Sequence, residues 1–220
     1  MPELRRDDSL WILDFGSDEN RFSPDWLDAV NGHLDELEAA TEPGALVTTA
    51  TGKFFSNGLD LDWVQAHPDQ FFPYVKRVEE FLSRVLTLPV PTVCAINGHA
   101  FGGGALIAFS HDYRIMRGDR GFFCLPEADI RIPFSVGMSA LVQSKLTPRS
   151  AIDAMTTARR YGGAEALSAG IVDAVASEEE VLPTAIELAR SLAGKDRGTL
   201  GTIKQRMFAS VTAALAEPLA

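Results

Sequence analysis

Three consecutive glycines at residues 102–104 join two apolar segments near the middle of the chain. The first segment, residues 91–96, is typical of a buried strand, and the second, residues 105–109, of the start of a helix. Glycines at such a turn let backbone N–H groups approach a ligand closely, and a helix N-terminus adds positive partial charge. The pattern indicates a site for a phosphate or an oxyanion, although close packing of helix on strand would need the same glycines.

Known phosphate-binding patterns do not fit this glycine run. No Lys-Ser or Lys-Thr pair follows the glycines, so the P-loop pattern is absent. The run also lacks the spacing and the position of the glycines that open the first βαβ unit of a dinucleotide-binding fold. Of the functional interpretations, stabilisation of an oxyanion remains.

A carboxylate, Glu127, follows another short apolar segment and stands beside Pro126. Burying a carboxylate there is costly unless it is paired or has a chemical role. A salt bridge to Arg131 or Arg114 would satisfy it structurally. In a functional site, desolvation would raise the pKa of Glu127, which suits a base that must later return its proton.

Hydrophobic periodicity predicts the elements that carry these residues. Strands are expected over residues 10–15, 45–50, 91–96, 112–116 and 121–125. Helices are expected from Ser23-Pro24 to about residue 37, as a turn at 60–63, and over 71–86, 105–110, 151–157, 163–169, 181–192 and 200–215. Strands alternating with helices indicate an α/β domain that ends in a helical part. We predict one domain over residues 1–220, with its α/β core at about 1–135 and the helical part at about 136–220.

Composition excludes several classes of function. The net charge of −10 disfavours general binding to nucleic acid or to anionic membranes. No apolar run reaches the length of a spanning helix, and the N-terminus lacks a signal-peptide core, so a cytoplasmic protein is expected.

Cys94 and Cys124 stand in apolar surroundings and are interpreted as buried thiols. The four histidines have no ligand partners at metal-binding spacing, so no metal is expected.

Four segments, in order, resemble the crotonase, or enoyl-CoA hydratase/isomerase, superfamily. They are residues 52–61 (GKFFSNGLDL), 91–106, 125–130 (LPEADI) and 163–173, within a resemblance that extends from about Leu10 to Val175. The resemblance implies a spiral of ββα turns and an acyl-CoA thioester substrate, with no cofactor beyond the coenzyme A of that substrate. It also implies a homotrimer or a dimer of trimers.

The same resemblance assigns roles to residues of this chain. Glu127 aligns with the catalytic acid/base, and the backbone N–H groups of Leu59 and Gly103 align with the oxyanion hole. A side chain at position 103 is expected to obstruct the thioester oxygen. The implied substrate pocket comprises Phe55, Asn57, Gly58, Gly102, Leu106 and Ile130. Lys53 is a candidate contact for a CoA phosphate, although a solvated lysine fits the sequence equally well.

Leu106 distinguishes between reactions within this superfamily. Hydratases carry a second catalytic Glu two residues after the last glycine of the turn, where this chain has Leu106. Moving a double bond needs only one base, and an apolar wall keeps water from the dienolate. We therefore predict a Δ3,Δ2-enoyl-CoA isomerase, with enoyl-CoA hydratase as the alternative enzyme.

Arg131 departs from the family pattern, because relatives usually have Gly at this position. A cation there could pair with Glu127 and lower its pKa, which would damp activity. This residue therefore keeps open a non-catalytic protein that binds acyl-CoA.

Overall fold

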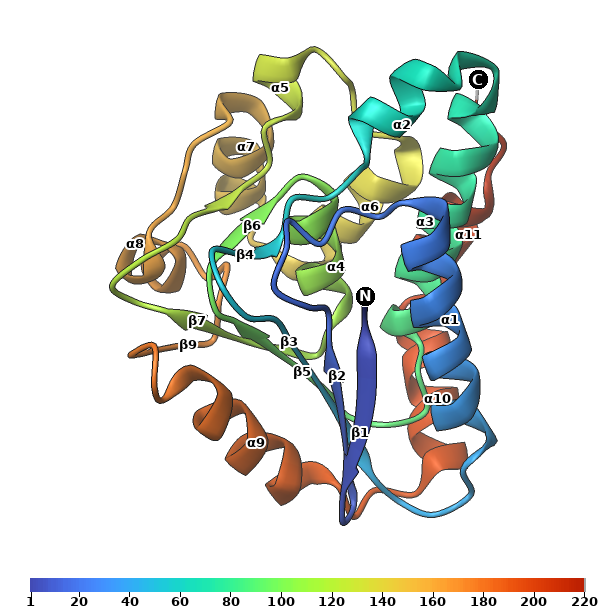
Figure 1. Ribbon diagram of the computed structural model, residues 1–220, viewed down its shortest axis with the longest axis vertical. Coiled ribbons are helices and arrows are strands. Elements are labelled where there is room, and N and C mark those ends of the chain that lie inside the picture. Colours follow the sequence, from blue (N-terminus) through green and yellow to red (C-terminus); the bar gives the residue numbers. More distant parts are fainter. Residues whose placement is uncertain (220) are drawn as a thin grey trace.

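The computed structural model describes residues 1–219, which fold into two sheets surrounded by helices (Figure 1). The larger sheet has the strand order β1-β2-β3-β5-β7-β9, and only the β1–β2 pair is antiparallel. Its strands are β1 (Glu3–Asp7), β2 (Leu10–Asp14), β3 (Ala45–Thr49), β5 (Thr92–Ile96), β7 (Tyr113–Arg117) and β9 (Ala174–Ala176). The smaller, parallel sheet has the order β4-β6-β8, formed by β4 (Phe54–Ser56), β6 (His99–Phe101) and β8 (Phe123–Cys124).

Each turn of the chain supplies one strand to each sheet and then a helix. The pairs are β3 with β4, β5 with β6, and β7 with β8. The helices that follow them are α2 (Leu61–Ala66) with α3 (Phe71–Leu86), α4 (Gly103–Ser110) and α5 (Glu127–Ile130). A short 3-10 helix, Pro68–Gln70, separates α2 from α3. This repeat confirms the predicted spiral of ββα turns, in which the ends of successive turns meet at one place.

The first helix, α1 (Pro24–Ala39), begins where its local chemistry predicts. The hydroxyl of Ser23 accepts a hydrogen bond from the Trp26 N–H at 3.2 Å, and Pro24 occupies the first turn. Residues at helical spacing then point into the core, among them Val30 and Leu34. Figure 1 shows α1 and α3 on one side of the larger sheet and α9 (Val181–Leu192) on the other.

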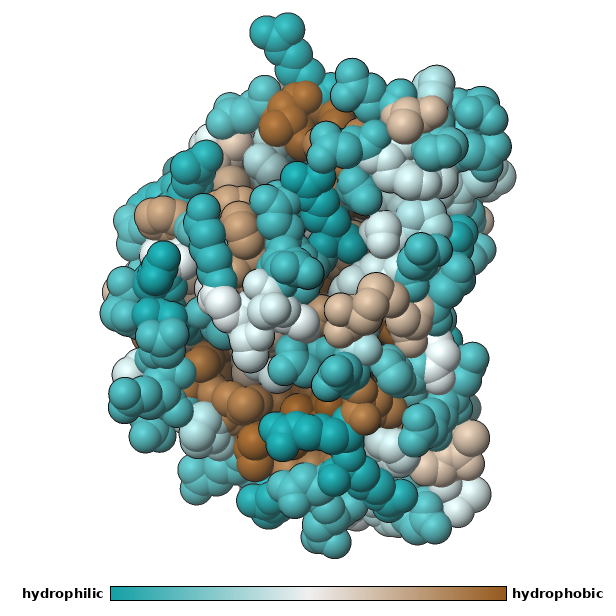
Figure 2. Space-filling view, viewed as in Figure 1, coloured by the Kyte–Doolittle hydropathy of each residue, from teal (hydrophilic) through white to brown (hydrophobic). Residues whose placement is uncertain are grey.

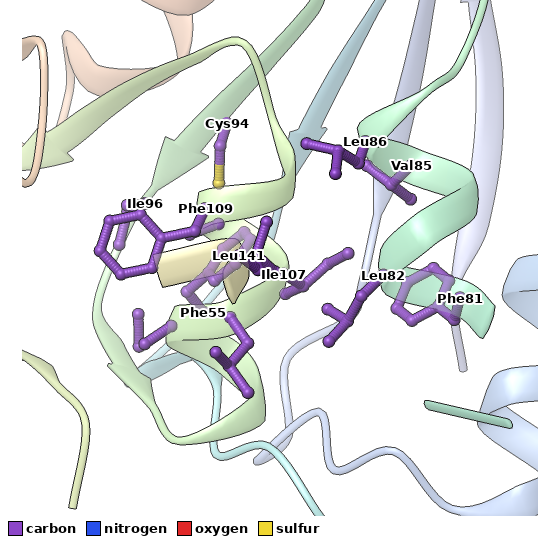
Figure 3. Packing of buried hydrophobic residues seen from close by; sticks show 14 of the residues in the cluster. Phe55, Phe81, Leu82, Val85, Leu86, Cys94, Ile96, Ile107, Phe109 and Leu141 are labelled. Atoms are coloured by element: carbon purple, nitrogen blue, oxygen red, sulfur yellow. The ribbon is translucent and has the colours of Figure 1, made fainter. Parts of the chain in front are cut away.

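The helix α4 is buried along its whole length, which is what an apolar surface on every side predicts. Figure 3 shows Ile107 and Phe109 of this helix among side chains from β5 and α3, including Cys94 and Leu82. The glycine turn at its N-terminus is therefore held by the centre of the core. Cys94 and Cys124 are both buried free thiols.

The C-terminal helices fold back over the spiral. They are α6 (Val136–Lys145), α7 (Pro148–Thr157), α8 (Gly163–Ser168), α9, α10 (Arg197–Met207) and α11 (Ala209–Ala216). The last of them, α11, packs against α6 and α3. The ammonium of Lys204 in α10 is 2.6 Å from the Asp112 carboxylate, just before β7, which ties this part to the sheet. Within residues 1–219, no helix combines the length and the apolar character that crossing a membrane requires.

The structure corrects one predicted boundary near the site. Residues 121–125 were expected to form a strand that ends at Glu127, but β8 comprises only Phe123 and Cys124. Glu127 is instead the first residue of α5. Short apolar segments do not distinguish a strand from an extended connection, because pairing with a neighbouring strand decides it.

The close contact behind the glycine turn provides a stability test. A Cβ at Gly104 would lie 2.2 Å from the Ser56 carbonyl oxygen, so Gly104→Ala should lower the free energy of unfolding by about 1–3 kcal/mol. Gly32 in α1 has no heavy atom within 4 Å of such a Cβ, and Gly32→Ala should raise stability by about 0.5–1 kcal/mol. Chemical denaturation of both variants checks this, and equal stability of the two would contradict it.

Candidate active site

A cavity of about 390 Å³ opens where the ends of the spiral turns meet. Its wall combines the segment before α2, the glycine turn and first turn of α4, the start of α5, and Met138 of α6. Apolar side chains reach the surface over α5 (Figure 2), where Ile130 is 45% exposed. Most of the residues that line the cavity are apolar, which suits the hydrocarbon part of a ligand.

Glu127 places its carboxyl group in this cavity without a partner. Its Oε2 atom is buried and accepts no hydrogen bond within residues 1–219. Burial raises the pKa of Glu127 to about 7, and a hydrogen bond from its own backbone N–H offsets only part of that rise. A carboxyl group that titrates near neutral pH can both remove and return a proton at carbon.

Neither arginine that could have paired with Glu127 does so. Arg114 donates to the Ile171 carbonyl at 2.7 Å and lies 3.4 Å from the Asp173 carboxylate. Arg131 is exposed and forms no ion pair with Glu127 within residues 1–219, although both border a shallow depression outside the cavity. The suggested pairing that would lower the Glu127 pKa is therefore wrong. Arg131 has φ +59°, a left-handed conformation that glycine adopts more readily.

Two residues that line the cavity have backbone N–H groups with no acceptor within residues 1–219. The N–H groups of Leu59 and Gly103 donate no hydrogen bond to residues 1–219, and both residues line the cavity. Gly58 brings them together, because a Cβ on it would lie only 2.5 Å from the Gly103 nitrogen. Its carbonyl accepts from Phe22 N–H at 2.8 Å, which fixes the segment. Two free donors on lining residues could bind a developing oxyanion, and the role of Leu59 and Gly103 as an oxyanion hole stays a prediction.

The need for glycine at position 103 has a different origin from the one expected. A Cβ there would lie 2.9 Å from the Phe22 ring and 3.1 Å from Gly58 Cα, behind the cavity wall. The position that faces the carboxylate is Gly102, where a Cβ would lie 3.7 Å from Glu127 Oε1. Its φ of +52° also favours glycine.

The predicted pocket residues divide into three groups. Asn57, Gly102, Leu106 and Ile130 line the cavity, as expected. Gly58 lies behind the wall and holds the two donors together. Phe55 is wrong as a pocket residue, because its ring is fully buried 5.2 Å from that of Phe15 in the core.

Lys53 also lies away from the cavity. Its ammonium is exposed over the Phe54 ring, 5.0 Å from the centroid. Contact with a CoA phosphate stays a prediction. No group of three His, Cys, Asp or Glu side chains that could hold a metal occurs within residues 1–219.

Sequence reasoning missed the polar network around the segment that carries the Leu59 N–H group. Arg21, on the cavity rim, pairs with Asp62 and, at 2.5 Å, with Glu19. The backbone N–H of Asn57 donates to the Glu19 carbonyl at 2.8 Å. The Tyr74 hydroxyl accepts from Asp60 N–H and donates to the Phe22 carbonyl, both at 2.9 Å. Apart from the Arg21–Glu19 pair, no local signal marks these residues, because their other partners are distant in sequence.

Comparison with known proteins gives a consistent result. The family model of enoyl-CoA hydratase/isomerase matches residues 13–220. Enoyl-CoA delta isomerase 3 of Arabidopsis thaliana is 38% identical over 204 residues, which span 89% of this chain and 86% of that protein. The peroxisomal enoyl-CoA delta isomerase 2 of the same plant is 36% identical over 206 residues, with the same shares covered. The structure of human mitochondrial Δ3-Δ2-enoyl-CoA isomerase has a TM-score of 0.89 at 27% identity, covering 97% of this chain and 85% of that one.

The burial of Glu127 should be measurable as a loss of stability. Its pKa rises from 4.5 when unfolded to about 7 when folded, so the folded chain holds the extra proton between these values. The free energy of unfolding should therefore fall as pH rises from about 4.5 to 7. Glu127→Gln should not show this pH-dependent fall. The free energy of unfolding of Glu127→Gln minus that of the native protein should therefore increase by up to about 3 kcal/mol between pH 4.5 and pH 8.

Denaturant unfolding at both pH values, with Asp129→Asn as the matched control, checks this prediction. Asp129 is an exposed carboxylate two residues away. A parallel pH response of the native protein and Glu127→Gln would show that the carboxyl group is not desolvated.

Proposed function

Because the chain belongs to the enoyl-CoA hydratase/isomerase family, we propose that it moves the double bond of a 3-enoyl-CoA to position 2. The observation that carries this proposal is that Glu127 is the single unpaired carboxylate in the lining of the cavity. Leu106 of helix α4 lines the same cavity. The other carboxylate in the lining, Asp62, is paired with Arg21. The delta isomerase names of the plant relatives support the same reaction.

The proposed reaction is a proton transfer through one base. The ionised carboxylate of Glu127 removes a proton from C2 of the thioester, and the electron pair moves toward the thioester oxygen. The N–H groups of Leu59 and Gly103 donate to that oxygen, and losing one such donor typically costs about 3 kcal/mol of transition-state stabilisation. Glu127 then returns the proton at C4, which leaves the double bond between C2 and C3.

The apolar wall favours isomerisation over hydration. Leu106 is buried, and Met138 and Ile130 line the same cavity. Adding water across a double bond benefits from a second acid/base group to activate that water, and Leu106 cannot provide one. Apolar neighbours also limit the access of water to the dienolate. The hydratase alternative is disfavoured for this reason.

Arg131 is the feature that would favour a non-catalytic acyl-CoA-binding protein. That residue does not pair with Glu127, whose pKa is raised, so the reason for this alternative is lost. The trimer or dimer of trimers, the cytoplasmic location and the lack of a further cofactor stay predictions.

Glu127→Gln should abolish isomerisation while leaving the affinity for a CoA thioester nearly unchanged, because the amide keeps the shape but cannot carry the proton. In the native protein, kcat/KM should rise with pH through about 7, where Glu127 becomes ionised. A steady-state assay with 3-enoyl-CoA across this pH range measures both effects. Asp129→Asn is the control, and a Glu127→Gln variant with a tenth of native turnover would remove Glu127 from the central role.

The native protein should convert 3-enoyl-CoA to 2-enoyl-CoA much faster than it hydrates 2-enoyl-CoA. Leu106→Glu should slow isomerisation and introduce some hydration, since a second buried charge admits water and raises the Glu127 pKa further. Leu106→Gln separates the effect of charge from that of polarity. Coupled assays with both substrates decide the matter: hydration as fast as isomerisation in the native protein would overturn the assignment.

A further inference from the structure

A second cavity, of about 380 Å³, lies between α10, the end of α6 and the start of β7. It shares no lining residue with the candidate active site. Its walls are mostly apolar, formed by side chains that include Leu192, Leu200 and Phe208. Two apolar residues of α10 at this cavity are also exposed to solvent, Ile203 by 51% and Met207 by 60%.

The charge of this second cavity is opposite to that of the whole protein. The chain has five lysines and a net charge of −10, and three of the five line this one cavity: Lys145, Lys195 and Lys204. Asp112 is the only carboxylate in the lining. An apolar cavity with excess positive charge is suited to an anion that carries a hydrocarbon chain.

The two inner lysines differ in how their charge is balanced. Lys204 is 2.6 Å from the Asp112 carboxylate and donates to the Val90 carbonyl at 2.8 Å, so its charge is compensated. Lys145 donates to the His111 carbonyl at 3.2 Å and lies 4.3 Å from the centroid of the Phe208 ring. Within residues 1–219, Lys145 forms no ion pair. A partly buried ammonium without a counter-ion is costly, and a bound anion would remove that cost.

We propose that this second cavity binds a medium-chain carboxylate, with the carboxylate group on Lys145 and the alkyl chain along the apolar residues of α10. One uncompensated ammonium inside the cavity fits the single charge of a carboxylate. The exposed Lys195 at the rim adds attraction for an anion that approaches. This site is independent of the proposed isomerisation.

The protonation of Lys145 makes binding depend on pH. Arg114, Asp112, Lys204 and Asp173 are the charged groups that act on it, two cations and two carboxylates. Burial lowers the pKa of Lys145 to about 8. A carboxylate favours the charged form, so binding should be strong below this pH and should weaken as pH rises above it.

Octanoate is the probe, and methionine methyl groups report where it binds. Met207 lines the second cavity and Met138 lines the candidate active site, so ¹³C-methyl labelling of methionine distinguishes the two. At pH 7, octanoate should shift the Met207 signal and leave Met138 unchanged. Octanol, which has the same chain without the charge, should bind at least about tenfold more weakly, as expected for the loss of a charge-assisted hydrogen bond.

Variants at Lys145 test the ammonium directly. Lys145→Met keeps an unbranched, mostly apolar side chain without the ammonium and should weaken octanoate binding about tenfold or more, whereas Lys145→Arg should retain most of it. Arg149→Met, which changes an exposed cation outside both cavities, should leave octanoate binding unchanged. Thermal unfolding establishes that each variant is folded, and the Lys145→Arg result keeps the test decisive if Lys145→Met unfolds.

Three results would overturn the proposal. One is a shift of Met138 alone, which would place octanoate in the active site. Another is equal binding of octanoate to the native protein and to a folded Lys145→Met variant, or loss of octanoate binding in a folded Lys145→Arg variant. The third is a Met207 signal that changes with protein concentration but not with octanoate, which would assign this surface to a second copy of the chain.

Discussion

The close contact between residues 56–58 and the glycine turn at 102–104 is the constraint on which the rest of the site depends. Side chains at Gly58 or Gly104 would overlap backbone atoms of the facing segment. Because both positions lack a Cβ, the backbones approach closely enough that Leu59 and Gly103 line one cavity. The parallel pairing of β4 with β6 sets this register, and the buried helix α4 prevents the turn from moving away.

The second feature of the site is a charge that the fold leaves without a partner. Glu127 follows a two-residue strand and begins a four-residue helix, so its carboxyl group is buried by neighbours from other elements. Folding therefore carries an electrostatic cost at this position, seen in the raised pKa. Core packing elsewhere must offset that cost, and the contact of α11 with α3 and α6 closes the core close to the cavity.

Three cations, Lys204, Arg114 and Lys145, show how differently the same fold treats charge. Lys204 has a carboxylate and a carbonyl as partners, and Arg114 has the Asp173 carboxylate and two carbonyls. Lys145 has only a carbonyl and an aromatic ring. Glu127 and Lys145 are thus a carboxylate and an ammonium that line different cavities, each without an ion pair within residues 1–219. Incomplete compensation of buried charge is what marks both places as candidates for binding or chemistry.

The sequence predicted the longer helices and the glycine turn, because helical spacing, capping residues and consecutive glycines act locally. It did not predict the short strands β4 and β6, which form only by pairing with each other and with β8. It also predicted roles for Glu127, Leu59, Gly103 and Leu106, since these residues lie within contiguous segments that resemble a known family, and the structure places all four along one cavity. Only the tertiary structure decided that Arg131 leaves Glu127 unpaired and that Phe55 packs into the core. The network of Arg21 and the grouping of three lysines around one cavity depended on it as well. Such contacts join residues far apart in the chain, and burial, which sets the pKa of Glu127, depends on every element packed around it.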